Sequence, residues 1–172
     1  MTKNLIKCLE PVLFQNFHPS EFSLSFLEQD CSVYYIDSNR NIHFCESIET
    51  SKGTSRIIVS ACFIQNDTII LLSTRKSFQK RGFAKELLQH VVLNFNILIL
   101  HTRVSNTKAI DLYLKCGFQI DSLQENFYYY TPIKENAYRM IYRREFINES
   151  KNIEENKVLN ISELEELSDE RR

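Results

Sequence analysis

The chain has 172 residues, of which 43% are hydrophobic and 25% charged, a balance typical of one globular domain with a single core. Its formal net charge of −1 argues against binding nucleic acid through charge alone. No apolar run approaches the roughly 20 residues that cross a bilayer, and the charged first fourteen residues contain no signal-peptide core. We therefore expect a soluble, cytoplasmic protein with no membrane or nucleic-acid partner.

The charge is unevenly distributed along the chain. Residues 145–172 carry nine acidic and four basic side chains, a net charge of −5, whereas the rest carries thirteen acidic and seventeen basic ones, a net charge of +4. The sequence thus predicts a domain at residues 1–146 and an acidic, disordered tail at residues 147–172. A mildly basic domain suits a small anionic ligand.

The first half of the chain predicts two helices and then four strands. Apolar residues recur at helical spacing over residues 3–14, and the Pro-Ser-Glu sequence at residues 19–21 starts a second helix. The strands are expected at residues 32–36, 42–45, 56–64 and 68–73. The last of them is apolar over four consecutive residues, which predicts burial on both faces.

The second half predicts a parallel strand pair, one further helix and two final strands. Apolar residues between 83 and 95 follow a helical period, and residues 97–100 form a second continuous apolar strand, so a right-handed crossover is expected. A helix capped by Ser105-Asn106 ends at Cys116-Gly117, where glycine supplies the left-handed stop. Strands at residues 118–123 and 137–142 complete an α/β fold.

The five cysteines argue against a metal site. They number an odd five, are scattered, and form no CxxC pair, a pattern that fits neither a zinc site nor a disulfide framework. Cys62 lies in an apolar run, where a buried thiol is expected. A reducing compartment follows from this cysteine usage.

A glycine-containing loop at residues 79–84 (Gln-Lys-Arg-Gly-Phe-Ala) lies between a strand and a helix. The first turn of a helix has unpaired N–H groups and a partial positive charge, and Gly82 lets a pyrophosphate approach the backbone. The loop matches neither the nucleoside-triphosphate nor the three-glycine dinucleotide motif. A helix start with solvated basic residues is the alternative interpretation. The basic side chains around it are Arg75, Lys76, Lys80, Arg81 and Lys85.

Two motifs in this order resemble those of the GNAT superfamily. The first is Q-x-x-G-x-A at residues 79–84, and the second is N-x-x-A-x-x-L-Y-x-K-x-G-F at residues 106–118. The resemblance implies a GNAT fold, a mixed central sheet flanked by about four helices, with acetyl-CoA as co-substrate. It also implies a cofactor site whose members are Leu72, Ser73, Thr74, Gln79, Lys80, Arg81, Gly82, Phe83, Ala84, Lys85, Asn106, Ala109, Tyr113 and Lys115.

The resemblance narrows to protein N-terminal acetyltransferases, and most closely to the catalytic subunit of the NatE type. It covers residues 1–144 and is strongest over residues 68–143. It implies acetyl transfer to the α-amine of protein N-termini, with a large helical-repeat auxiliary subunit and the NatA complex at the ribosome as expected partners. The candidate substrate residues are Phe14, His18, Ile70, Phe127, Tyr128 and Tyr129, where His18 departs from the family pattern and has a surface position as its alternative interpretation.

Acyl transfer to an amine requires a base, a stabilised thioester oxygen and a proton donor for the thiolate. The strand at residues 68–73 contains no acid, which leaves His101 and tyrosines as candidates. An unperturbed imidazole titrates at about 6.5. The resemblance implies that His101 is a base acting through water and that Tyr113 serves the leaving thiolate. The alternatives are a histidine that satisfies a strand end and a core tyrosine.

The remaining features concern the substrate. Residues 127–130 are four adjacent aromatics, which in the family wall the peptide channel, with a strand of cross-strand aromatic pairs as the alternative. The family's catalytic tyrosine on the fourth strand corresponds to Thr68, a poor proton carrier, and residues 15–18 replace the family's Pro-Val-x-Tyr run. These departures raise two further hypotheses: a weakly active GNAT subunit of a ribosome-associated complex, or a GNAT acting on lysine or small amines.

Overall fold

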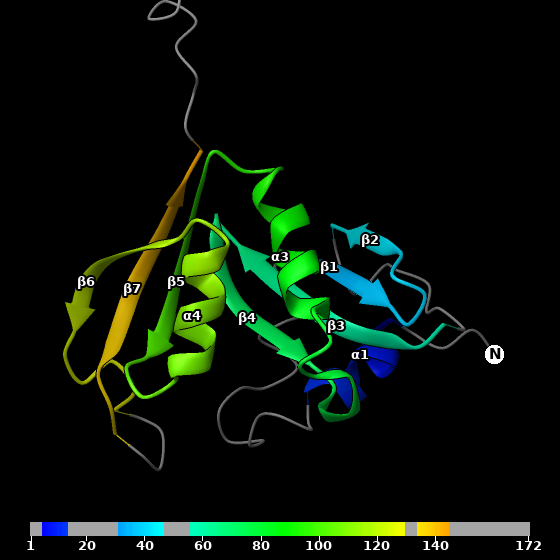
Figure 1. Ribbon diagram of the computed structural model, residues 1–172, viewed down its shortest axis with the longest axis horizontal. Coiled ribbons are helices and arrows are strands. Elements are labelled where there is room, and N and C mark those ends of the chain that lie inside the picture. Colours follow the sequence, from blue (N-terminus) through cyan, green and yellow to red (C-terminus); the bar gives the residue numbers. More distant parts are fainter. Residues whose placement is uncertain (1–4, 14–30, 47–55, 130–133, 145–172) are drawn as a thin grey trace, which may run out of the picture.

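The computed structural model describes residues 5–13, 31–46, 56–129 and 134–144. Within them, seven strands form one sheet in the order β2-β1-β3-β4-β5-β7-β6, flanked by three α-helices (Figure 1). The elements are α1 (Leu5–Leu13), β1 (Ser32–Asp37), β2 (Ile42–Cys45), β3 (Ile58–Gln65), β4 (Thr68–Thr74), the 3₁₀ turn η1 (Lys76–Phe78), α3 (Phe83–Val92), β5 (Ile97–Arg103), α4 (Thr107–Lys115), β6 (Gln119–Gln124) and β7 (Ala137–Arg143). The predicted helix after residue 19 and the predicted tail lie outside the described residues.

The sheet is mixed, as expected. The pair β4–β5 is parallel and every other neighbouring pair is antiparallel. The strand-helix-strand unit β4–α3–β5 therefore produces the predicted parallel pair. The mixed sheet and its flanking helices confirm the predicted α/β fold.

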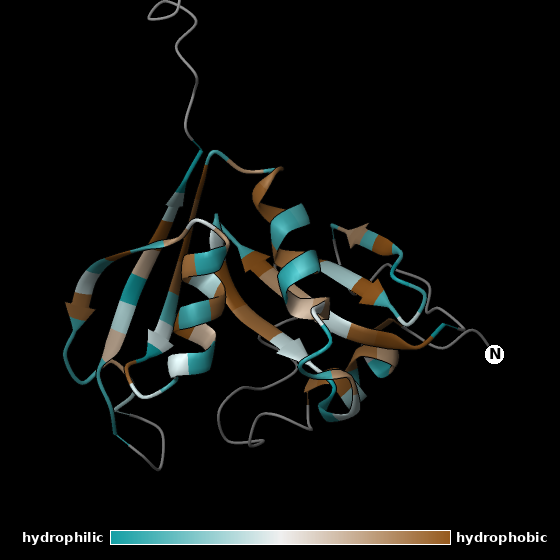
Figure 2. Cartoon of the chain, viewed as in Figure 1, coloured by the Kyte–Doolittle hydropathy of each residue, from teal (hydrophilic) through white to brown (hydrophobic). Residues whose placement is uncertain are grey.

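Two apolar clusters cover the two faces of the sheet. The larger cluster joins α3 and α4 to one face, with Leu88, Leu98 and Phe118 at its centre, and the smaller one packs α1 against β3 on the other. Strand β3 is buried from Ile58 through Ile64 because helices cover both of its faces. Figure 2 shows the central strands as largely hydrophobic, while α3 and α4 turn hydrophilic residues outward.

The predicted burial of β4 on both faces is wrong. Ile69 and Ser73 are the buried residues of β4, while its other five are only partly buried. Strand β5 alternates, with Leu98, Leu100 and Thr102 buried and the residues between them partly exposed. Among the described elements, α1 packs mainly against β3 and less against β4, so it covers the second face of β3 more fully than that of β4.

The ends of the helices largely follow the sequence signals. Helix α3 begins after Gly82 as predicted, but it ends at Val92 rather than near Phe95, which nevertheless packs against the larger cluster. Helix α4 ends in a Schellman motif: Gly117, at φ 89°, donates its N–H to Leu114 O at 3.1 Å, and the Phe118 N–H reaches Tyr113 O at 3.0 Å. No described helix is long and apolar enough to cross a membrane.

All five cysteines lie in the described residues, and none of them forms a disulfide. The described residues contain no group of His, Cys, Asp and Glu side chains arranged to hold a metal ion. Cys62 is buried, and this burial raises the pKa of its thiol. A thiol in this protonated state is a packing residue rather than a nucleophile.

Candidate active site

Strands β4 and β5 diverge beyond their first residues. Their pairing joins Thr68 to Ile99 and Ile69 to Leu100, and from there the two strands splay apart toward their carboxyl ends (Figure 1). On its other side, β4 carries one extra residue, Ile70, because Ile69 pairs with Ile64 and Leu71 pairs with Phe63 of β3. Such a bulge bends a strand. The carboxyl ends of diverging parallel strands are a common place for ligands in α/β folds.

The N-terminus of α3 lies at this end of the sheet and has no side-chain cap. Gly82 occupies the capping position at φ 85°, and no side chain there accepts a hydrogen bond from the first turn. The first helical bond runs from the Glu86 N–H to Gly82 O at 3.0 Å. A Cβ atom at Gly82 would have no atom within 4 Å. The first-turn N–H groups are therefore open to an anion.

The loop before Gly82 is fixed by its own contacts. The Arg75 N–H donates to Val59 O at 2.9 Å, and the Gln79 side-chain amide donates to Thr74 O at 3.1 Å. Lys80 has a φ of 60°, which is uncommon for a residue with a side chain. Lys80, Arg81 and Lys85 are exposed. The predicted phosphate loop is therefore an ordered turn with exposed positive charge around the helix start.

Other predicted cofactor residues are committed to the protein through their side chains. The Ser73 hydroxyl donates to Val12 O at 2.7 Å, and the Thr74 hydroxyl lies 2.8 Å from the hydroxyl of Ser60. Phe83 is buried, and Leu72 is partly buried against the same core. The side chains of Ser73 and Thr74 thus hold this end of β4 in place through hydrogen bonds within the protein.

Helix α4 contributes a cap and a tyrosine. The Asn106 side-chain oxygen accepts the Ala109 N–H at 3.3 Å, which confirms the predicted cap. Tyr113 is 8% exposed, and burial raises the pKa of its phenol. A phenol in this state stays protonated and donates a hydrogen bond. Lys115 pairs with Asp111 at 2.6 Å on the outer side of the helix.

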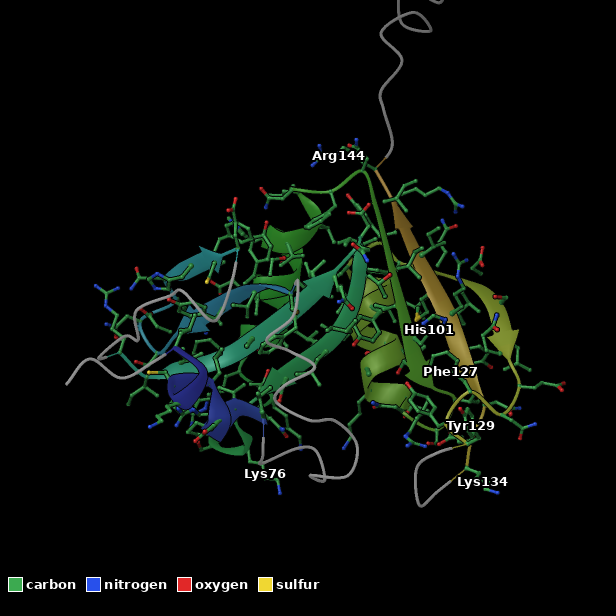
Figure 3. All side chains as sticks on the ribbon, turned by 180° about the vertical axis from the view of Figure 1, so that it is seen from behind. Lys76, His101, Phe127, Tyr129, Lys134 and Arg144 are labelled. Atoms are coloured by element: carbon green, nitrogen blue, oxygen red, sulfur yellow. The ribbon has the colours of Figure 1, made fainter. Side chains whose placement is uncertain are left out.

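His101 lies on the face of β5 opposite the one that α3 and α4 cover, because its neighbours Leu100 and Thr102 are buried and successive side chains of a strand alternate between faces. Its ring stacks on Phe127, with centroids 4.3 Å apart and planes at 11° (Figure 3). Burial, and then the charge of Arg139 directly across on β7, lower the pKa of His101 below 6.5. The imidazole is therefore a free base at neutral pH.

Phe127, Tyr128 and Tyr129 form part of a turn between β6 and β7, not the strand that was the alternative. The Tyr128 hydroxyl donates to His101 O at 3.3 Å, and the Arg103 guanidinium lies 4.1 Å from the centre of the Tyr128 ring. Tyr129 is 69% exposed. The turn is thus held against the end of β5, with its next aromatic side chain in solvent.

Glu135 joins this turn to the start of α4, and no sequence motif indicated it. Its carboxylate accepts the Ser105 N–H at 2.6 Å and the Ser105 hydroxyl at 2.9 Å, and it lies 3.5 Å from Arg103. These hydrogen bonds lower the pKa of Glu135. The Glu135 carbonyl accepts the Tyr128 N–H at 3.0 Å. One residue therefore contacts both the aromatic turn and the residue before the Asn106 cap.

The remaining predicted residues are placed as follows. Thr68 begins β4, and its hydroxyl donates to Asn66 O at 3.5 Å. Thr68 pairs with Ile99, two residues before His101. Ile70 is the bulge residue of β4. Phe14 and His18 lie outside the described residues.

The sequence profile of the Acetyltransferase (GNAT) family matches residues 13–118, more than half of the chain. The chain belongs to this family. The splayed β4–β5 pair and the uncapped start of α3 are thus features of a GNAT acetyltransferase, as the two sequence motifs indicated. No curated protein matches the chain in sequence.

Solved GNAT structures share its fold. Arabidopsis thaliana NAA60, solved with a bisubstrate analogue, has a TM-score of 0.64 at 19% identity, covering 84% of this chain and 96% of its own. The Escherichia coli ribosomal-protein-S18-alanine N-acetyltransferase has a TM-score of 0.58 at 18% identity, covering 86% and 96%. A Bacillus subtilis acetyltransferase in complex with CoA has a TM-score of 0.59 at 16% identity, covering 84% and 96%. At these identities the likeness establishes the fold.

Proposed function

We propose that this GNAT protein transfers the acetyl group of acetyl-CoA to the α-amine of protein N-termini, as enzymes of the NatE type do. The observation that carries the proposal is His101. It is a neutral base at the diverging end of β5, partly exposed and stacked on an aromatic turn.

The start of α3, which follows β4 and the glycine-containing loop, is suited to bind the co-substrate. The first-turn N–H groups of α3 are uncapped, and Gly82 leaves their approach free of any side chain. Lys80, Arg81 and Lys85 are exposed around them. Helix N-termini bind phosphate groups through such N–H groups and the helix dipole. We infer that this turn binds the pyrophosphate of acetyl-CoA, and that Asn106 and Tyr113 contact other parts of the same acetyl-CoA molecule.

The reaction needs two proton movements, and the site offers a group for each. His101 removes a proton from the attacking amine, through water as the family resemblance implies. The amine nitrogen forms a bond to the thioester carbon, and the carbon–sulfur bond breaks. The thiolate takes up the proton that the amine released, and the phenol of Tyr113, which its raised pKa keeps protonated, is suited to donate a hydrogen bond to the departing sulfur.

The aromatic turn favours a peptide N-terminus over a lysine side chain. Phe127 and Tyr128 cover His101 from one side and are fixed there by Arg103 and Glu135. A fixed wall beside the base restricts how a chain can pass through the site. A peptide N-terminus can enter such a site from one direction, whereas an internal lysine brings peptide on both of its sides. The N-terminus therefore fits this restriction better.

One observation favours a second candidate, a weakly active subunit that acts mainly within a larger ribosome-associated complex. The Thr68 hydroxyl, at the position of the family's second proton carrier, donates to Asn66 O within its own turn. A hydroxyl with a pKa far above neutrality relays protons poorly. His101 would then act without a second group.

The test is acetyl-CoA turnover against a panel of peptides with different first residues. Each peptide is also tested in a form with a blocked α-amine, with and without an internal lysine. We expect turnover on free α-amines and none on the blocked forms. Turnover that survives blocking and requires lysine would overturn the N-terminal assignment. Binding of acetyl-CoA without turnover on any peptide would instead favour the subunit hypothesis, which predicts that activity returns when a helical-repeat partner is added.

A further inference from the structure

The hairpin between β1 and β2 reaches the start of α3 through Arg40. The three contacts of this side chain lie within one helical turn of Gly82. One guanidinium nitrogen pairs with Glu86, and the other donates to Arg81 O at 3.1 Å. The guanidinium carbon also lies 4.5 Å from the centre of the Phe83 ring. Arg40 therefore contacts the residues on both sides of Gly82 and the residue one turn later.

The hairpin that carries Arg40 is organised by a buried carboxylate. Asp37 is fully buried and accepts hydrogen bonds from the N–H groups of Asn39 at 2.8 Å and Asn41 at 3.0 Å. His43 and Arg56 lie within 3.3 Å and 3.1 Å of the same carboxylate. Burial alone would raise the pKa of Asp37, but these hydrogen bonds outweigh it and hold the pKa well below its ordinary value. The hairpin is thus a fixed support.

The backbone of Arg40 itself is unusual. Its φ is 65°, in the left-handed region that residues other than glycine, asparagine and aspartate seldom adopt. Its N–H donates to Asp37 O at 3.0 Å. An arginine held in this conformation is consistent with a constraint from its side-chain contacts with α3.

We propose that Arg40 is a positioning residue that clamps the phosphate loop of the acetyl-CoA site. The proposal deepens the proposed function and rests on it. Arg40 holds Arg81 O and Glu86 so that the turn around Gly82 keeps its first N–H groups aligned before the anion arrives. Such preorganisation lowers the cost of binding. The effect belongs to the binding step, so Arg40 does not act on the reacting atoms.

A direct role for the Arg40 charge is the competing explanation, because half of the side chain is exposed. The two explanations differ at Glu86. If Arg40 attracts the ligand by charge, removing the acidic Glu86 should strengthen binding of an anion. If Arg40 clamps the loop through Glu86, removing Glu86 should weaken binding. The sign of the Glu86 effect therefore distinguishes them.

The experiment is calorimetry of CoA and dephospho-CoA binding to wild type, Arg40→Met and Glu86→Met. The matched control is Arg143→Met, which removes the same charge from an exposed residue of β7. Arg143 precedes Arg144, which lies at the other end of the sheet from Lys76 (Figure 3). We expect Arg40→Met to weaken both ligands by the same factor, about 3- to 10-fold for one charge-assisted hydrogen bond. Glu86→Met weakens them as well, and Arg143→Met leaves them unchanged.

Arg40→Gly is the control for a folding defect, because glycine adopts this positive φ without steric strain. It should keep the melting temperature of the wild type and still lose CoA affinity. Amide hydrogen exchange without ligand gives an independent reading, in which the Glu86 N–H exchanges faster in Arg40→Met. The clamp proposal would be overturned if the Glu86 N–H exchanged at the wild-type rate in Arg40→Met, or if Glu86→Met strengthened CoA binding. If the wild-type protein itself fails to bind CoA, the proposed function fails, and the exchange result still decides whether Arg40 orders the loop.

Discussion

The site has a cofactor side, at the starts of α3 and α4, and a substrate side, at the aromatic turn and His101. Different kinds of contact hold the two sides in place. On the cofactor side, the start of α3 and the cap of α4 are made from residues close together in sequence: Gly82 bonds to Glu86, and Asn106 bonds to Ala109. On the substrate side, Glu135 reaches Ser105 across 30 residues and Tyr128 reaches His101 across 27. Apart from the Arg40 contacts, backbone geometry within a few residues shapes the two helix starts on the cofactor side, whereas contacts between residues distant in sequence shape the substrate side. Variants on the cofactor side should therefore change the KM for acetyl-CoA, whereas variants on the substrate side should change turnover or the KM for the peptide.

His101→Ala should give the largest effect. Loss of a positioned general base lowers turnover by about 100- to 1000-fold, while the KM for acetyl-CoA stays within a factor of about two. Steady-state kinetics with a peptide substrate measure both terms. His90→Ala, at an exposed position on α3, is the control and should retain full turnover. Near-wild-type turnover in His101→Ala would remove the histidine from the mechanism.

Gly82→Ala should affect the cofactor side alone. The added methyl group points into open space, where the proposed pyrophosphate site leaves room for the ligand, and a residue with a side chain at φ 85° is strained by about 1 kcal/mol. We expect the KM for acetyl-CoA to rise about 10-fold, with turnover at saturation nearly unchanged.

Gly117→Ala is the matched control for Gly82→Ala. Gly117 has a φ of 89°, and its added Cβ would lie 3.3 Å from the Tyr142 ring. It should lose at least as much thermal stability as Gly82→Ala but keep the KM for acetyl-CoA. Equal KM values in the two variants would show that strain, and not access to the helix start, determines cofactor binding.

Glu135→Ala asks whether the two sides are independent. It removes the carboxylate that holds Ser105 and Arg103, so the aromatic turn should loosen and the KM for the peptide should rise about 3- to 10-fold. Acetyl-CoA affinity, measured by calorimetry, should change less. The exposed Glu125 in the same turn supplies the control, Glu125→Ala. An equal loss of both affinities would mean that Glu135 couples the sides into one unit.

Arg139→Gln should give the smallest effect, a shift of the pH profile. His101 must be unprotonated to act, so the rate falls as the pH drops through its pKa, which Arg139 helps to keep low. Removing that charge raises the pKa of His101, and Asp121, which pairs with Arg139, adds to the change. The acid limb of kcat/KM should move to higher pH, whereas Arg143→Gln should leave it in place. An unmoved limb in Arg139→Gln would mean that another group titrates there.

Much of the fold was predictable because its signals are local. The position of each described helix and strand was recognised within a few residues, and the helix starts at Gly82 and Asn106 were correct. The burial of β4 and β5 was not predictable, since an apolar run does not reveal whether a helix covers its second face. The roles of Phe14 and His18 stay predictions, as does the contact of acetyl-CoA with each cofactor residue.

The sequence by itself determined the family, the glycine-containing loop before α3 and the candidate base, because glycine positions, helix caps and motif order are properties of neighbouring residues. Only the tertiary structure placed Arg40 against Glu86, 46 residues away, and Glu135 against Ser105. Neither contact follows a helical or strand period, and neither acid belongs to a motif. Which charged side chains meet depends on how the β1–β2 hairpin and the β6–β7 turn pack against the helices, and that packing is decided when the sheet assembles.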